Sequence, residues 1–364
     1  MKQMYERPCY FSCHLLRCCV EEARGVMETS WMGQKRSYPM AKQPASSCGT
    51  PYKTTCGGQA LIEGIMMQGP EKRAVVVRKP NGELDITTTQ NKPRGKWASL
   101  PLVRGVFVFG SAMVHGVKAL MHSAEVSEDG QNGEEEEPGW LEQWLERHFS
   151  QEKAMSIFVT IAAALGIAFS VGLFILLPTA ITGLVRLVWP QMPLWVQAVL
   201  EGVLKVAIFL CYLWLCSHTK EMRRVFSYHG AEHKAIYCYE NGLELTVENV
   251  KKQPCHHPRC GTSFLFVVIV VSIFLSIVIF TPLEIKNTLL RMVLHLVLLP
   301  IIVGVTYEFN RYVGGHDNAL CRALRAPGMW MQNFTTFEPD ESMIEVAITA
   351  LNLVLPEKKG ADAW

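Results

Sequence analysis

Long apolar runs alternate with polar segments along this chain, and nearly all of the runs fall between residues 155 and 306. Because a helix rises about 1.5 Å per residue, a run of this length can cross a hydrocarbon core of about 30 Å. The four runs are Ile157–Leu177, Val196–Cys216, Phe264–Phe280 and Leu289–Thr306. They predict four transmembrane helices in two hairpins, over 155–217 and 264–306, with Pro178 ending or kinking the first helix.

A different pattern precedes these runs. Residues 51–100 are β-rich, and the short strands Val75–Arg78 and Leu84–Thr88 flank Pro80-Asn81-Gly82, where Asn-Gly is a strong hairpin signal. Ala60–Met67, flanked by glycines, is expected to form another strand. This segment therefore predicts a small β-structure outside the membrane.

Residues 101–150 are predicted to form amphipathic interfacial helices and an acidic linker. Between Pro101 and Val126, apolar residues recur at three- and four-residue steps, but basic residues and histidines interrupt them. Such a helix suits the membrane interface or a packed position better than a transmembrane one. Glu125–Glu137 is the linker, and Trp140–Phe149 is a short amphipathic helix with two tryptophans for the headgroup region.

The remaining segments complete the expected organisation. Residues 1–50 are a disordered leader or sequence upstream of a start at Met40, residues 218–263 a His/Cys-rich loop, and residues 307–364 a C-terminal segment. In that last segment, Ala326-Pro327-Gly328 predicts a turn, and the acidic residues from Glu338 open a final helix. The fold class expected is an α-helical integral membrane protein with a small α+β domain, built from the β-rich segment, the central loop and the last helix.

The charge distribution gives the orientation. The hairpin tips Trp189–Leu194 and Thr281–Lys286 carry a single basic residue, whereas lysines and arginines collect at the other ends of the helices. The positive-inside rule therefore predicts a multi-pass protein of the cell membrane, with both termini and the main polar loops in the cytoplasm. The net charge of +2 gives no reason to expect nucleic-acid binding, and the twelve cysteines are not spaced like a secreted disulfide framework.

Candidate chemistry is concentrated in the loop over 218–263. His229-Gly-Ala-Glu232-His233 has the H-x-x-E-H spacing of the inverted zincins. On a helix, histidines four residues apart share a face and can reach one metal, and Glu232 beside them can act as a general base. His257 and Cys260 lie in a second cluster and are expected to complete the site, where a thiolate favours zinc over magnesium.

Other residues have open interpretations. Glu308, which follows the fourth apolar run, is a further expected metal ligand, and Arg259 is an expected catalytic residue that stabilises an oxyanion or phosphate. Glu63 is an exposed strand residue, a ligand or a partner for a buried cation. His295 favours a hydrogen bond between helices, with proton relay or pairing to Glu201 as alternatives. Any single histidine is more often a surface or hydrogen-bonded residue than a ligand.

Five motifs in order resemble the YqhQ-like family of bacterial membrane proteins of unknown function. They are GGQALIEGIMMQGP (57–70), PLVRG (101–105), YHGAEHKAIYCYE (228–240), HPRCGTSF (257–264) and EPDESMIEVAI (338–348). The resemblance runs from about Cys56 to Leu355 and leaves out residues 1–50. It implies a predicted metal-dependent enzyme with no established substrate. The motif residues that it favours are His229, Glu232, His233, His257 and Cys260, to which it adds Glu63 and Arg104.

Two classes of function follow from these observations. The first is a zinc-type, metal-dependent hydrolase at the cytoplasmic membrane face, acting on a peptide bond or a lipid headgroup. The second is a non-catalytic membrane scaffold or regulator, or a transporter-associated protein, with a structural metal site. Both predict membrane lipids as partners, membrane proteins or lipid substrates as further ones, and no nucleic acid. The oligomeric state is left open.

Overall fold

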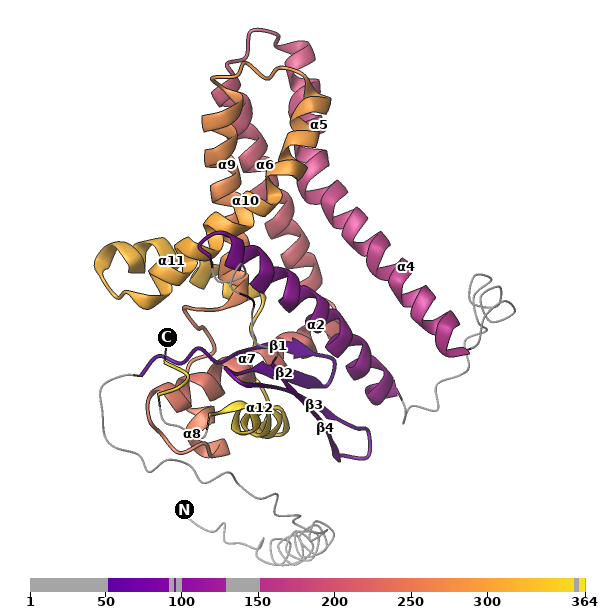
Figure 1. The fold of residues 1–364 in the computed structure, drawn as a ribbon, viewed down its shortest axis with the longest axis vertical. Coiled ribbons are helices and arrows are strands. Elements are labelled where there is room, and N and C mark those ends of the chain that lie inside the picture. The colour runs from indigo at the N-terminus through magenta and orange to yellow at the C-terminus, as the bar shows by residue number, and fades with distance from the viewer. Residues whose placement is uncertain (1–51, 92–94, 96–99, 129–150, 357–359, 364) are drawn as a thin grey trace, which may run out of the picture. The chain divides into compact units, whose positions relative to one another are not determined.

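The computed structural model describes residues 52–91, 95, 100–128, 151–356 and 360–363. The expected leader over 1–50, most of the acidic linker and the helix Trp140–Phe149 lie outside the described residues. Four strands come first and helices follow (Figure 1). The strands are β1 (Gly57–Leu61), β2 (Gly64–Gln68), β3 (Lys72–Arg78) and β4 (Leu84–Gln90). The helical elements are α2 (Val103–Glu128), α4 (Gln151–Val171), the π-helical η2 (Gly172–Leu176), α5 (Leu177–Val188), α6 (Leu194–Ser217), α7 (Lys220–Glu240), α8 (Val247–Lys251), α9 (Gly261–Phe280), α10 (Thr288–Gly315), α11 (Ala319–Met331), the 3-10 helix η3 (Gln332–Phe334) and α12 (Glu341–Val354).

The strands form an antiparallel meander in the order β1-β2-β3-β4, covered by helices on both faces. Alternate side chains of a strand point to opposite faces. Ile65 and Met67 accordingly pack in the core with α7 and α12, whereas Met66 packs with Ala119 of α2 on the other face. Burial on both faces explains why β2 is apolar without alternation. The sheet thus fixes the position of α7, which carries the H-x-x-E-H motif.

Two of the turns in this sheet differ in how well the sequence predicted them. The Asn-Gly hairpin is confirmed, since β3 pairs with β4 and Gly82 adopts a φ of 85°. The single strand expected over Ala60–Met67 is wrong, because the chain reverses at Ile62-Glu63 to form β1 and β2. Glu63 has a φ of 50°, and α7 holds its carboxylate through Arg224 and the Tyr228 hydroxyl, the latter at 3.1 Å. Tertiary contacts with α7 therefore hold a turn that carries no glycine or asparagine at that position.

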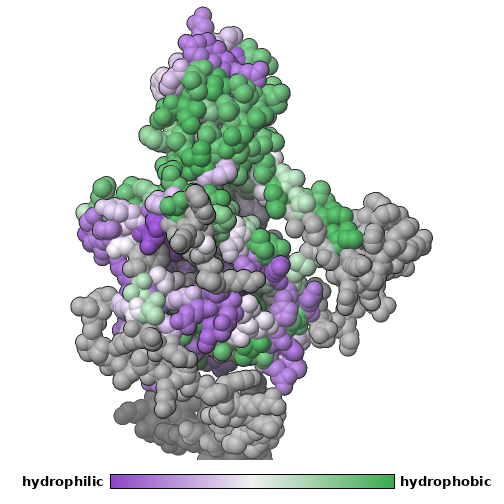
Figure 2. All heavy atoms as spheres, in the orientation of Figure 1, coloured by the Kyte–Doolittle hydropathy of each residue, from purple (hydrophilic) through white to green (hydrophobic). Residues whose placement is uncertain are grey.

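Five helical segments of the described chain are long and apolar enough to cross a membrane, by length and composition alone. Four are near the predicted runs, and apolar side chains cover that part of the visible surface, with polar residues at its tip (Figure 2). The hairpin tips lie where expected, between α5 and α6 and between α9 and α10. The count of about four differs from five because α2 also meets the length and composition criteria.

Two local predictions about proline are corrected. Of the two outcomes predicted for Pro178, an end of the helix is wrong: the helix changes to η2 before this residue and continues as α5 to Val188, so the candidate span shifts to Ala164–Val188. Ala326-Pro327-Gly328 is not a turn but lies inside α11. A helical proline loses a hydrogen bond and crowds the preceding turn, and the packing of α11 on α9 offsets this cost. Gly328 allows that packing, because a Cβ there would lie 2.7 Å from the Ser263 side chain.

A buried polar cluster joins α5, α6 and α10. Glu201 is 1% exposed. Its carboxylate accepts from Thr179 at 2.6 Å and pairs with Lys205 at 3.1 Å and Arg291 at 2.9 Å. His295 also contacts it, so the prediction that His295 bonds between helices, with Glu201 as a possible partner, is confirmed. Charges buried between apolar helices are stabilised by such pairing.

Candidate metal centre

Helix α7 places His229 and His233 on one face, because residues four apart are neighbours on a helix. The Thr219 side chain caps its first turn by accepting from the Met222 amide. Between the two histidines, Gly230 lets the segment before α12 approach closely, since a Cβ there would lie 2.1 Å from the Phe337 carbonyl oxygen. The motif therefore needs its glycine for packing as well as its histidines.

Cys260 completes the group from the other side. It is the N-cap of α9, and its sulfur accepts from the Thr262 amide at 3.4 Å. This position directs the sulfur to 3.1 Å from His229 Nε2. The ligand atoms of His229, His233 and Cys260 all lie within 4.8 Å of one another. Among the described residues, these three side chains form the group of potential ligands that is arranged to hold one metal ion.

Backbone carbonyls orient both imidazoles. His229 Nδ1 lies 2.8 Å from the Thr335 carbonyl oxygen, and His233 Nδ1 lies 2.5 Å from the Cys255 carbonyl oxygen. A carbonyl can only accept, so each Nδ1 carries a proton, and Nε2 is the ring nitrogen left to bind a metal. Metal-binding histidines commonly have this outer hydrogen bond, which fixes the tautomer and the ring orientation.

The electrostatics favour a thiolate. Burial raises the pKa of a thiol, but the neighbouring His229 and His233 outweigh this and hold the Cys260 pKa well below its usual value. Burial likewise lowers the pKa of His229, yet the Cys260 thiolate raises it to about 9. A thiolate is the form of cysteine that binds metals. The three potential donors are thus two imidazoles and one thiolate, a combination that fits zinc.

Glu232 lies next to this group on the same helix and is 5% exposed. Its Oε1 accepts from the Gly58 amide of β1 at 2.8 Å, while Oε2 is buried and has no hydrogen-bond partner. Leaving a buried carboxylate oxygen unpaired is costly, and such atoms call for an explanation such as an ion, a water or a catalytic role. The hydrogen bond from Gly58 therefore holds one carboxylate oxygen of Glu232, and the other oxygen is available to bind a ligand or accept a proton.

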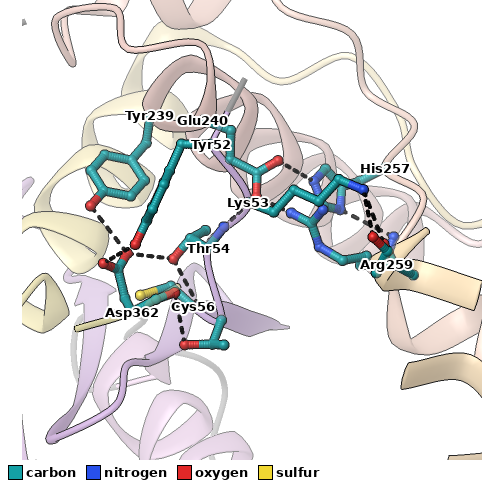
Figure 3. Close-up of polar contacts among 12 residues, drawn as sticks. Tyr52, Lys53, Thr54, Cys56, Tyr239, Glu240, His257, Arg259 and Asp362 are labelled. Carbon is teal, nitrogen blue, oxygen red and sulfur yellow. Dashed lines mark hydrogen bonds and ion pairs between the residues drawn. The ribbon is translucent and has the colours of Figure 1, made fainter. Parts of the chain in front are cut away.

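Two of the other predicted site residues, His257 and Arg259, are in a different network (Figure 3). His257 and Arg259 both contact Glu240 near the end of α7, the former at 3.4 Å between Nε2 and Oε2. Burial, followed by the charge of His233, lowers the pKa of His257 to about 3. Glu308 pairs with Arg104 of α2. The structure therefore does not bring His257 or Glu308 into the three-ligand group, and it gives Arg259 a carboxylate partner.

Several positioning residues were missed from the sequence. Gln332 is fully buried and forms two hydrogen bonds with the His257 backbone. Its side chain accepts from the His257 amide and donates to the His257 carbonyl, each at 2.8 Å. Asp362, also fully buried, accepts from Tyr52 at 2.5 Å and Thr54 at 2.7 Å. Both lie far along the chain from their partners, and neither belongs to a recognisable motif. Glu240 closes the quoted YHGAEHKAIYCYE stretch, so the resemblance could have drawn attention to it.

Comparisons with known proteins agree with the resemblance. Residues 100–357 match the family described as "Protein of unknown function (DUF1385)". The chain is also 32% identical over 306 residues to the "Uncharacterized protein YqhQ" of Bacillus subtilis (strain 168), covering 82% of this chain and 92% of that protein. No solved structure matches. The chain therefore belongs to the DUF1385 family and is similar to this YqhQ protein.

Proposed function

We propose that this protein is a membrane-bound, metal-dependent hydrolase whose centre is formed by His229, His233 and Cys260. The observation that carries the proposal is the convergence of three ligand atoms within 4.8 Å beside a buried carboxylate with a free oxygen. Catalytic zinc sites have three protein ligands and keep one position open, whereas structural sites have four. When bound, zinc supplies Lewis acidity at neutral pH.

The roles of this chain's residues follow from their positions. The two imidazoles bind through Nε2, since both Nδ1 atoms are engaged by carbonyls. Glu232 holds its place through the Gly58 amide and accepts a proton from a water through Oε2. Neither His257, Glu308 nor Arg259 is given a role at the metal, because each has its own partner elsewhere.

The membrane placement supports action at the cytoplasmic face. We propose that four helical segments, α4 through α5, α6, α9 and α10, cross the membrane. We place α2 at the interface, because its C-terminal half packs on the sheet, where His122 pairs with Asp85 at 2.9 Å. The centre lies at the start of α9, the end of that helix opposite its hairpin tip. Positive-inside orientation puts this end in the cytoplasm.

A structural metal site is the second candidate, and one observation favours it. His233 is 2% exposed and Cys260 caps α9, so a bound ion would tie α7 to the start of a candidate membrane helix. The two candidates differ at Glu232. A structural site does not need its free oxygen, whereas a hydrolase does.

The test compares purified wild type with Glu232→Gln, using nitrophenyl esters and nitrophenyl phosphodiesters as chromogenic substrates. General-base catalysis is typically worth about 10²–10⁴-fold, so we expect a loss of that order with metal content unchanged. Glu221→Gln, at an exposed position in the first turn of the same helix, is the matched control. Metal-loaded Glu232→Gln that hydrolyses as fast as wild type would overturn the hydrolase. Metal-loaded wild type without hydrolysis would favour the structural site.

A further inference from the structure

A cleft of about 360 Å³ opens at Pro258 and Arg259, the residues that precede Cys260 of the candidate centre. Its walls come from the segment before β1, the end of α7, the loop between α8 and α9, and α11. The residues that matter here are Tyr52, Lys53, Tyr237, Arg259, Arg322 and Arg325. Ligand sites in proteins typically occupy about 300–1,000 Å³, so the cleft is large enough for a small ligand or a headgroup. The metal ligands themselves do not line it.

The lining carries more positive than negative charge. Four basic residues face two acidic ones, Glu240 and Asp317. Glu240 pairs with Arg259, and Asp317 lies 2.7 Å from Arg325. Lys53 donates only to carbonyl oxygens at the end of α10, at 3.2 and 3.5 Å. Two cations therefore face the cleft without a carboxylate partner.

Arg322 is the more available of these two. Its side chain is exposed and forms no ion pair or side-chain hydrogen bond within the described part of the chain. Arginine's planar fork of donors matches phosphate oxygens better than any other side chain. The tyrosines Tyr52 and Tyr237 add aromatic surface to the walls. An unpaired guanidinium beside aromatic walls is typical of a site that binds an anion with several oxygens.

The position of α11 relates the cleft to the membrane surface. This helix runs across the ends of α9 and α10 and packs on both (Figure 1). Arg322, Arg325 and Met329 share its cleft-facing side, whereas Leu320 and Leu324 lie on the opposite side and are 68% and 41% exposed. Basic residues on one side and exposed leucines on the other are typical of a helix lying in a membrane interface.

We infer that this cleft binds a phosphate group, presented by an anionic lipid headgroup or by a soluble phosphate compound. Arg322 provides the free guanidinium, and Lys53 and Arg325 provide the surrounding positive charge. This inference concerns binding and holds whether or not the nearby centre carries a metal.

The test measures binding to the purified full chain in neutral detergent by thermophoresis. Three probes are used: dihexanoyl phosphatidic acid, dihexanoyl phosphatidylcholine and inorganic phosphate. Wild type is expected to bind phosphatidic acid at least about tenfold more tightly than phosphatidylcholine. Binding of phosphatidic acid alone identifies a lipid source, and binding of inorganic phosphate as well shows that the phosphate group suffices.

The variants locate the site. Arg322→Glu should weaken binding of phosphatidic acid by about tenfold or more, and Arg322→Gln by less, because only the first adds a repelling charge. Lys252→Glu is the matched control, since Lys252 is exposed, outside the cleft and paired with Glu248. Equal weakening by Arg322→Glu and Lys252→Glu, equal binding of the two lipids, or no binding of phosphatidic acid and phosphate would each overturn the inference.

Discussion

At the scale of single residues, the sequence predicted part of the candidate centre. The spacing of His229 and His233 on a helix was sufficient to place them together, and Cys260 was expected beside them. The sequence could not distinguish Cys260 from His257 within one loop, because the choice depends on remote contacts. Gln332 holds the His257 backbone, and the His257 side chain then faces Glu240. Neither interaction leaves a pattern in the sequence.

Gly230→Ala is predicted to destabilise the protein by about 1–3 kcal/mol, the usual cost of overpacking. The added Cβ would lie 2.1 Å from the Phe337 carbonyl oxygen, and the segment that must move also supplies the Thr335 carbonyl to His229. Thermal unfolding in detergent and metal content both measure the effect. Gly110→Ala is the control, since nothing lies within 4 Å of a Cβ there. Equal melting temperatures for the two variants would contradict this packing argument.

At the scale of elements, apolar runs and polar tips located the long helices well. The hydrophobic pattern does not record what a helix packs against, which is why the turn predicted at Pro327 was wrong. The Glu63 turn was missed for the same reason, since Arg224 and Tyr228 hold it from α7. Contacts between elements also place Glu201 among several cations, where its charge has a structural role.

Glu201→Gln is predicted to destabilise the helical bundle by about 3–5 kcal/mol, because it leaves Lys205 and Arg291 buried without their carboxylate. Unfolding by titration with dodecyl sulfate in mixed micelles measures the change. Glu284→Gln removes an exposed pair with Lys286 at a hairpin tip and should change stability by no more than about 1 kcal/mol. Similar losses in both variants would show that burial of the pair does not matter.

At the scale of the whole molecule, contacts between distant parts of the chain enclose the candidate centre and the cleft. The C-terminal Asp362 binds the segment before β1, and the Tyr239 hydroxyl at the end of α7 joins the same carboxylate at 3.1 Å. This contact holds Tyr52 and Lys53 at the wall of the cleft. The hydrophobic pattern could not predict it, because the segments are short, polar and at opposite ends of the described chain.

Asp362→Ala is predicted to lower the free energy of unfolding by about 1–3 kcal/mol, since it removes the acceptor of three hydroxyl groups, none of them on an exposed residue. Faster amide exchange should appear at residues 52–56 and at the cleft, while α9 and α10 keep their protection. Asp85→Ala, on the far strand β4, should leave residues 52–56 protected. Unchanged exchange there in Asp362→Ala would show that the C-terminal contact does not hold this segment.

The central claim is tested most directly by the metal content of the purified full-length protein. We expect about one zinc ion per chain in wild type. His229→Ala and Cys260→Ser should lose it, because each removes one of the three proposed protein ligands. Cys255→Ser and His218→Ala change the same residue types outside the group and should retain it. A wild-type protein without bound divalent metal, or full occupancy in both His229→Ala and Cys260→Ser, would contradict the proposed centre.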